Sequence, residues 1–221
     1  MNTSTPSPAP SRRERRSAEL RDRLFNAALD LFAKKGFAET TVGDITDAAD
    51  VGKGTFFNYF PSKDHILLAF GEMQLAKLES AVAEARQASE PMPRFLHALG
   101  LRMTQEPMRN PAIIRAILLA YLSSTPVREA MLALQKRVLA LHSEMIRLGQ
   151  QRGEIRDDLP AVEIAQVFRQ TIFGTLLIWS LYDDASLLSR METAFEVLWT
   201  GLQSRNFPPA AGVTRFGADG E

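Results

Sequence analysis

Apolar residues recur at helical spacing along nearly the whole sequence, and no segment alternates apolar and polar residues as a strand would. The first stripe places six side chains on one helix face: Leu20, Leu24, Ala27, Ala28, Leu31 and Phe32. Gly36 follows at the position where helices commonly end in a left-handed residue. We therefore predict an all-α protein with a first helix over residues 17–35.

Prolines and turn residues divide the remaining sequence into further helices. Thr41 is placed to cap the second helix, with Asp44 as a shortened capping-box partner, and Pro61 ends the third. Ser62 then caps a long fourth helix, which extends to about residue 88. The other expected helices cover residues 42–49, 53–59, 94–105, 112–123, 127–151, 162–181 and 187–204. The sequence thus predicts about nine helices.

The composition excludes several classes of protein. The 221 residues include 26 basic and 26 acidic ones, so the formal net charge is zero and any charged surface must be local. The absence of cysteine excludes disulfides, thiolate zinc sites and thiol catalysis. The three histidines fall on different expected helices without a carboxylate at ligand spacing, and no common catalytic motif is present. The segment "RDD", residues 156–158, is interpreted as a charged loop with a helix-capping aspartate, in preference to a metal site. We expect no metal, no cofactor and no enzymatic activity.

The sequence also bears on localisation. The most apolar run, residues 171–182, is too short to span a bilayer. The N-terminus has no apolar stretch of the kind that a secretory signal contains. We therefore expect a soluble, cytoplasmic protein without a membrane partner.

Two short helices joined by the turn "DVG" and preceded by a longer helix are typical of a helix-turn-helix unit. Within "KGTFFNYF", residues 53–60, Phe56 and Phe60 are four residues apart and share a face that is expected to pack inward. The opposite face is small and polar: Gly54, Thr55 and Asn58. Lys53 and Phe57 lie at the border between the two faces.

The polar face has the chemistry of a nucleic-acid contact. The second helix of such a unit lies in the DNA major groove, where Thr and Asn side chains hydrogen-bond base edges. Lys53 and Lys63 stand at the two ends, in position for phosphates, and the helix start after Thr41 offers backbone N–H groups to another phosphate. For each residue alone, core packing or a solvated surface is the simpler interpretation, so the prediction rests on the whole pattern.

Residues 37–67, "FAETTVGDITDAADVGKGTFFNYFPSKDHIL", resemble the DNA-binding domain of TetR-family transcriptional regulators. The matching features are Gly36, the Thr-Thr pair, "DI..AA.V", "KGTFFNYF" and the Pro-Ser-Lys turn. The resemblance implies an N-terminal three-helix helix-turn-helix DNA-binding domain and a C-terminal helical ligand-binding and dimerisation domain. It also implies DNA contacts at Thr41, Lys53, Gly54, Thr55, Asn58, Tyr59 and Lys63.

The sequence departs from the family pattern at a few positions. Phe57 stands where the family often has a tyrosine, so a phosphate contact is lost or replaced by apolar contact with a sugar or a thymine methyl. Gly52 stands where a serine often caps the recognition helix. Val42 and Gly43 cannot hydrogen-bond bases through their side chains. The third helix is therefore expected to carry most of the direct readout.

Four segments are expected along the chain. Residues 1–16 are rich in Ser, Thr and Pro and then basic, which predicts a disordered basic arm. This arm either follows DNA phosphates or the minor groove, or is a solvated tail. Residues 17–63 form the helix-turn-helix domain, residues 64–206 form the effector-binding and dimerisation domain, and residues 207–221 form a flexible tail.

The resemblance implies three partners: double-stranded DNA with a palindromic operator, a second copy of the chain, and an unknown small-molecule effector. Candidates for the ligand pocket are Phe95, Leu99, Met103, Ile117, Tyr121, Met131, Leu134, His142, Met145 and Trp179. Candidates for the dimer interface are Phe168, Ile172, Gly174, Thr175, Phe195 and Leu198. For each of these residues, packing in the core is the alternative interpretation.

The function that follows is a sequence-specific transcriptional regulator, a repressor released from its operator by a small apolar ligand. Activation instead of repression depends on where the operator lies. One alternative is a ligand-independent DNA-binding or chromosome-organising protein of the same fold. The other alternative, a helical enzyme, has no motif in its favour.

Overall fold

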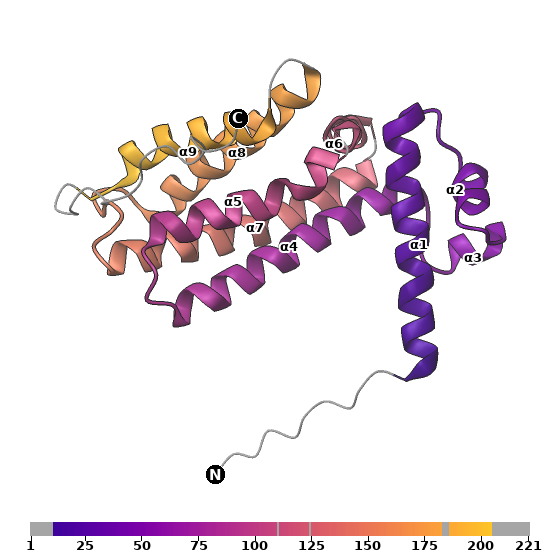
Figure 1. The fold of residues 1–221 in the computed structure, drawn as a ribbon, viewed down its shortest axis with the longest axis horizontal. Helices are drawn as coiled ribbons and strands as arrows, with labels where there is room; N and C mark the ends of the chain where they lie inside the picture. Colours follow the sequence, from indigo (N-terminus) through magenta and orange to yellow (C-terminus); the bar gives the residue numbers. More distant parts are fainter. Residues whose placement is uncertain (1–10, 110, 124, 183–185, 205–221) are drawn as a thin grey trace, which may run out of the picture. The chain divides into compact units, whose positions relative to one another are not determined.

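The computed structural model describes residues 11–109, 111–123, 125–182 and 186–204 (Figure 1). Within these ranges the chain forms nine α-helices and one isolated antiparallel bridge between Ile155 and Gln203, which confirms the all-α prediction. The helices are α1 (Arg12–Lys35), α2 (Val42–Ala48), α3 (Lys53–Phe57), α4 (Asp64–Gln87), α5 (Met92–Arg109), α6 (Ala112–Ser123), α7 (Thr125–Gln151), α8 (Ala161–Leu181) and α9 (Leu187–Leu202). The chain divides into two compact units, one up to Ile66 and one from Leu67.

Helix α1 begins at Arg12, earlier than the expected start at residue 17. The cause is a capping box that the sequence analysis missed. The Ser11 hydroxyl accepts the Glu14 N–H at 3.2 Å, and the Glu14 carboxylate accepts the Ser11 N–H at 2.7 Å. The prediction of a disordered arm is therefore wrong for residues 12–16, which are helical. Residues 1–10 of that arm and the predicted tail, residues 207–221, lie outside the described residues.

The core of the first unit joins α1 to the two short helices. Its buried side chains come from all three helices and from the segment after α3: Leu24, Ala28, Phe32, Ile45, Phe56 and Phe60. The rings of Phe56 and Phe60 lie 5.7 Å apart, and Phe32 packs edge-on against Phe37 at 4.9 Å. The inward aromatic face expected for residues 53–60 is therefore present, and it holds α3 against α1 and α2.

Two tight turns bound helix α3. Before it, Asp50 takes a positive φ of 51° and the Val51 N–H donates to the Thr46 carbonyl at 3.0 Å. After it, the N–H groups of Tyr59 and Phe60 both donate to the Phe56 carbonyl at 2.9 Å. The helix therefore ends at Phe57, and not at residue 59 as expected.

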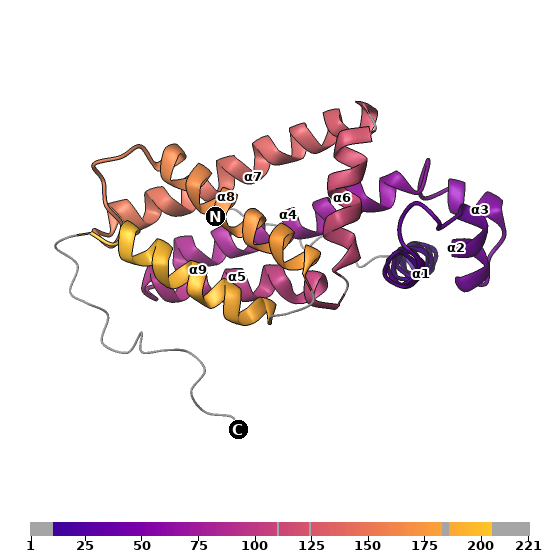
Figure 2. The same ribbon diagram turned by 90° about the horizontal axis from the view of Figure 1, so that it is seen from above.

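The second unit is a helical bundle. Figures 1 and 2 show α4, α5, α7, α8 and α9 running alongside one another, with α6 crossing them at one end. Helix α8 packs against α6, α7 and α9, and α5 packs against α9. Its main core takes buried side chains from five of the helices, among them Leu78, Leu96, Met145, Phe168 and Trp199. Apolar faces from helices far apart in sequence are thus buried together.

The loop before α8 differs from expectation in its capping. An aspartate of "RDD" was expected to cap the helix, but Pro160 is the N-cap residue and no side chain caps α8. Asp158 instead binds Arg156 through two hydrogen bonds of 2.6 Å. The expected aspartate cap is wrong because the neighbouring arginine engages the carboxylate.

Candidate functional site

The start of α2 carries a complete capping box. The Thr41 hydroxyl accepts the Asp44 N–H at 3.1 Å, and the Asp44 carboxylate accepts the Thr41 N–H at 2.7 Å. Lys35 forms an ion pair with the same carboxylate at 2.5 Å. The hydrogen bond from Lys35, followed by those from Thr41, holds the pKa of Asp44 well below its usual range. These contacts fix Thr41 at the exposed start of the helix.

Helix α3 presents a small polar surface. Lys53, Gly54 and Asn58 are exposed, Thr55 is half-buried, and Gly52 is an N-cap residue without a capping side chain. Phe57 is the large apolar residue on this surface, with 55% of its area exposed. Its ring stands edge-on to buried Phe56 at 5.4 Å. An exposed aromatic ring held by a buried one is a rigid apolar contact surface among hydrogen-bonding groups.

The starts of α2 and α3 meet at Gly43 and Lys53. A Cβ atom added to Gly43 would lie 3.4 Å from Lys53 Cε and 3.7 Å from Lys53 Nζ. The lysine stem therefore crosses the first turn of α2, where the absence of a side chain leaves room for it. Its ammonium group stands beside first-turn N–H groups that have no intrahelical acceptor. Both features favour an anion at this position.

Lys63 has partners that the sequence did not predict. Its ammonium group donates to the carbonyls of Phe37, Ala38 and Thr40 at 2.8, 3.0 and 2.9 Å. It also lies 4.6 Å from the centre of the Phe37 ring. An ammonium group has three donors, and here all of them bind the loop between α1 and α2. The structure thus gives Lys63 the role of holding this loop, where a phosphate contact was expected.

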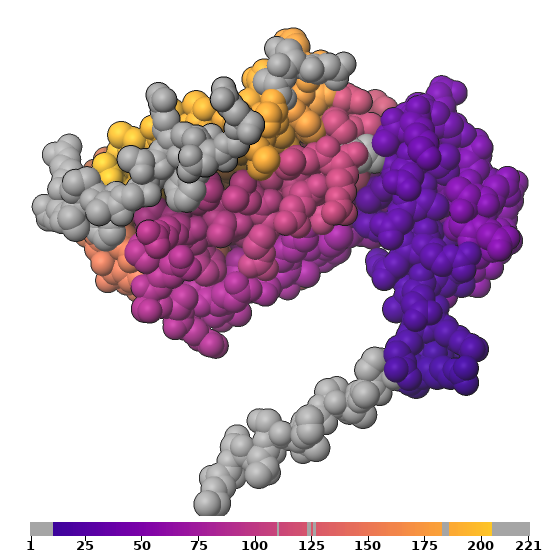
Figure 3. Space-filling view, viewed as in Figure 1, coloured from indigo at the N-terminus to yellow at the C-terminus, as the bar shows by residue number. Residues whose placement is uncertain are grey.

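Tyr59 and the arginines of α1 complete this surface. The Tyr59 hydroxyl lies 3.1 Å from the Ser17 hydroxyl and so joins the end of α3 to α1. The exposed basic residues of the first α1 turns are Arg12, Arg13, Arg15 and Arg16. Figure 3 shows these turns projecting beyond α2 and α3. Positive charges are unfavourable at a helix N-terminus, and in the described part of the chain these four form no ion pair.

Comparison with known proteins identifies a family model and several relatives that this chain resembles. The family model "Bacterial regulatory proteins, tetR family" matches residues 24–70. The transcriptional regulator EthR of Mycolicibacterium smegmatis is 28% identical over 143 residues, which are 64% of this chain and 66% of that protein. The repressor KstR of Rhodococcus jostii is 28% identical over 184 residues, 81% of this chain and 82% of that protein.

A solved structure is similar over most of the chain. The Thermus thermophilus FadR repressor, determined in complex with lauroyl-CoA, superposes with a TM-score of 0.62 and 28% identity, covering 87% of this chain and 100% of that one. The chain belongs to the TetR family of transcriptional regulators. Its first unit is the DNA-binding helix-turn-helix domain, and its second is the helical domain of a TetR-family regulator.

The second unit of this TetR-family regulator contains an apolar cavity of about 170 Å³. Several of the residues predicted for a pocket line it: Leu99, Met103, Ile117, Met131, Leu134 and His142. The other four predicted residues do not line the cavity: Phe95, Tyr121, Met145 and Trp179. Met145 is fully buried in the main core, and Trp179 packs on a smaller cluster at the end of α8. Phe168 and Ile172, predicted for the dimer interface, line the cavity instead. Three polar residues that line the cavity were not predicted from the sequence, because polar residues on amphipathic helices ordinarily face solvent: Gln74, Gln135 and Arg169.

A shallow groove of about 630 Å³ runs between α8 and α9. Of the residues predicted for the dimer interface, Gly174, Thr175 and Leu198 line it, whereas Phe195 is buried in the core. The sequence analysis missed Ile178 and Val197, which are 47% and 68% exposed. On α8, one stripe at heptad spacing follows this side: Val167, Thr171, Gly174, Ile178 and Leu181. A stripe of this period is the pattern by which two helices pack along each other.

Helix α8 is also long and apolar enough to cross a membrane by length and composition. The expectation that no segment has this property considered residues 171–182 alone, whereas the helix extends from Ala161 to Leu181. Only 17% of its most apolar window is buried within the chain. Part of its exposed apolar surface, at Ile178, borders the groove between α8 and α9.

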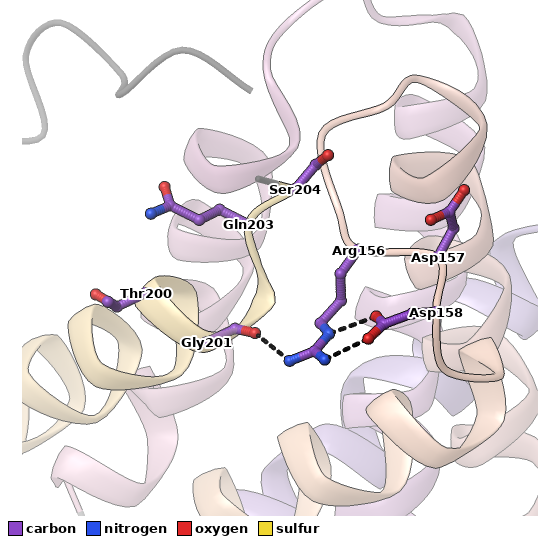
Figure 4. Close-up of a pocket in the computed structure, with 7 residues that line it drawn as sticks. All are labelled: Arg156, Asp157, Asp158, Thr200, Gly201, Gln203 and Ser204. Atoms are coloured by element: carbon purple, nitrogen blue, oxygen red, sulfur yellow. Dashed lines mark hydrogen bonds and ion pairs between the residues drawn. The ribbon is translucent and has the colours of Figure 1, made fainter. Parts of the chain in front are cut away.

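A second surface hollow lies between the loop before α8 and the end of α9 (Figure 4). Arg156 is its main cation, but Asp158 accepts from its Nε and Nη2 atoms, and the Gly201 carbonyl accepts from Nη1 at 3.2 Å. With each nitrogen engaged, this arginine braces the loop against α9. Among the described residues, no group of three or more histidine and acidic side chains is placed to hold a metal ion.

Proposed function

We propose that this chain is a homodimeric repressor that binds a twofold-symmetric operator and leaves it when a small, largely apolar ligand occupies the second unit. DNA binding follows from the family and from the surface of α2 and α3. Two observations support the control of DNA binding by a ligand. One is the apolar cavity among α4–α8, and the other is that the FadR relative was solved with lauroyl-CoA bound.

The DNA contacts that we propose differ in kind. Thr55 and Asn58 hydrogen-bond base edges, and Phe57 packs on a sugar or a thymine methyl group. Lys53 and the first-turn N–H groups after Thr41 bind a phosphate. Gly54 permits close approach of the backbone. Tyr59 and Lys63 shape the surface through Ser17 and the loop between α1 and α2.

The groove between α8 and α9 supports a homodimer. A partly exposed heptad stripe on one helix is matched by its own copy across a twofold axis, which closes the interface without further partners. Two recognition helices related by this axis read half-sites about one DNA turn apart. A palindromic operator follows from the same symmetry, and a DNA-binding protein of this kind acts in the cytoplasm, where the chromosome lies.

The observation that carries this proposal is the exposed polar surface of α3, with Phe57 and Lys53, on a buried aromatic base. The test is selection of bound fragments from the genome of the source organism, followed by anisotropy titration at fixed salt. We expect a palindromic site bound at about 10⁻⁸ M or tighter, far above non-specific DNA. Weak, sequence-independent binding by a folded dimer would contradict it and favour the chromosome-organising alternative.

A further inference from the structure

The apolar cavity of the second unit has a small and specific set of polar groups in its wall. Helices α4 to α8 line it, and nearly all the lining side chains are apolar. The polar side chains are Gln74, Gln135, His142 and Arg169, and the wall contains no acidic residue. Ligand sites of this kind obtain orientation and specificity from a few polar groups in an apolar surround.

Arg169 is the cation of this cavity. One of its Nη atoms donates to the Gln135 side-chain oxygen, while its Nε atom is buried and has no hydrogen-bond partner. Across the described residues it forms no ion pair with a carboxylate. A guanidinium group stays charged under all ordinary conditions. A partly buried positive charge without an anion is costly. An anion bound at Arg169 would therefore stabilise the site by supplying a negative charge.

The neighbouring polar groups do not supply that charge. The Gln74 amide nitrogen binds Glu106 at 3.3 Å, but Glu106 forms an ion pair with Lys77 at 2.6 Å. The Gln74 carbonyl oxygen is buried without a partner. The ring of His142 lies 3.0 Å from the Val138 carbonyl through its Nδ1 atom.

His142 is neutral at physiological pH. Burial, and to a smaller extent the charge of Arg169, lowers its pKa to about 4, although the Val138 carbonyl acts in the opposite direction. A neutral imidazole that donates through Nδ1 has an acceptor at Nε2. The cavity wall thus carries one positive charge and no negative charge, and the rest of it is apolar except for Gln74, Gln135 and neutral His142.

We propose that the effector of this regulator is a compact apolar monocarboxylate, whose carboxylate binds Arg169 and whose body fills the apolar part of the cavity. This inference rests on the proposed ligand-controlled function and names the class of ligand. An anion at Arg169 satisfies the buried Nε donor. Arginine is also the side chain best matched to a carboxylate, since its donors form a planar fork.

The size of the cavity restricts the apolar body. Its volume is about 170 Å³, and an apolar cavity of about 150 Å³ is known to hold benzene. One aromatic ring or a chain of about eight carbons therefore fits without rearrangement. Lauroyl-CoA, with which the FadR relative was solved, is larger than this volume and would extend outside the cavity.

The test uses calorimetry and thermal shift on the full chain without DNA, in acetate-free buffer. The probes are benzoate, phenylacetate and octanoate, each paired with its neutral amide, and lauroyl-CoA. We expect at least one acid to raise the melting temperature and to bind at least tenfold tighter than its amide. The inference is overturned if no acid binds more tightly than its amide, or if lauroyl-CoA alone binds.

Variants assign the effect to Arg169. Arg169→Met should lose at least tenfold in affinity for the acid and little for the amide, whereas Arg169→Lys should retain part of the preference. The matched control is Arg147→Met, an exposed arginine on α7, which should bind the acid as the natural chain does. Equal acid affinity in Arg169→Met and the natural chain would overturn the inference. If Arg169→Met does not fold, the inference is still tested by the Arg169→Lys variant and by the ratio of acid affinity to amide affinity in the natural chain.

Operator binding is measured separately on the unliganded protein. A chain that prefers acids but does not recognise an operator contradicts the proposed function and leaves the pocket assignment standing. A chain that binds its operator but shows no acid preference overturns the pocket assignment alone. Release of the operator by the acid that binds best, and loss of that release in Arg169→Met, supports both.

Discussion

Lys63 and Lys53 stand at the two ends of the recognition segment, yet their ammonium groups have different partners. Lys63 binds three main-chain carbonyls, whereas Lys53 is exposed and crosses Gly43. A lysine engaged by the protein contributes to stability, and an exposed one is available to a phosphate. Substitution of Lys63 is therefore expected to change mainly the stability of the fold, and substitution of Lys53 mainly the affinity for DNA.

Replacing Lys63 by methionine keeps an apolar stem and removes both the three hydrogen bonds and the contact of the ammonium group with the Phe37 ring. We expect the loop at residues 37–40 to open more readily by about 1–3 kcal/mol, since its carbonyls lose a charged donor. Amide hydrogen exchange measures this opening. Lys53→Met is the control: its stability should stay within about 0.5 kcal/mol, while the salt slope of DNA binding falls by about one. The reverse pattern would return the phosphate contact to Lys63.

His142 gives the stability of the second unit a defined pH dependence. Its pKa is about 4 in the folded chain and near 6.5 in an unfolded one. Between these values the unfolded state binds a proton that the folded state does not. The contribution of His142 to stability is therefore complete above about pH 6.5 and declines as the pH falls toward 4. His142→Phe should lose less thermal stability than the natural chain between pH 7 and pH 5. Equal losses would show that the group is protonated in the folded state.

At the scale of elements, periodicity was enough to predict the helices, and capping decided where they begin. Apolar stripes gave α6 and α8 to within about a residue, but α1 begins earlier because Ser11 and Glu14 form a capping box inside a segment interpreted from its composition and charge alone. The surface of α3 was predictable because an aromatic face and a polar face alternate at helical spacing. The division between cavity, core and groove was not predictable, since all three use the same apolar residues.

The arginines in the first turns of α1 allow the effect of their charge on DNA binding to be tested apart from helix formation. Changing Arg12, Arg13, Arg15 and Arg16 to glutamine keeps good helix formers and the Ser11 cap. We expect unchanged helix content and a smaller salt slope of DNA binding, by about 0.9 for each phosphate contact removed. Circular dichroism and anisotropy titrations at several salt concentrations measure the two quantities. A salt slope equal to that of the natural chain would show that these arginines are only a solvated surface.

At the scale of the whole molecule, α8 carries residues of both the proposed dimer interface and the proposed ligand site. One side of the helix lines the cavity through Phe168, Arg169 and Ile172, and another carries the exposed stripe through Gly174 and Ile178. Helix α4 begins directly after Lys63 and reaches the cavity at Phe70 and Gly71, so it carries residues of both units. A ligand alters the operator affinity only as far as it binds the two conformations of the regulator unequally.

The proposed dimer can be tested at Ile178, which is 47% exposed and lines the groove between α8 and α9. Ile178→Glu places a carboxylate, and by symmetry its copy, in a mostly apolar interface, where each carboxylate loses its hydration and the two repel each other. We expect a folded monomer in sedimentation velocity and a loss of operator affinity of at least tenfold, because each half-site then binds one recognition helix alone. Val162→Glu is the matched control: it lies on the same helix, is 43% exposed and does not line the groove. A dimeric Ile178→Glu variant with a monomeric Val162→Glu variant would place the interface on another face of α8.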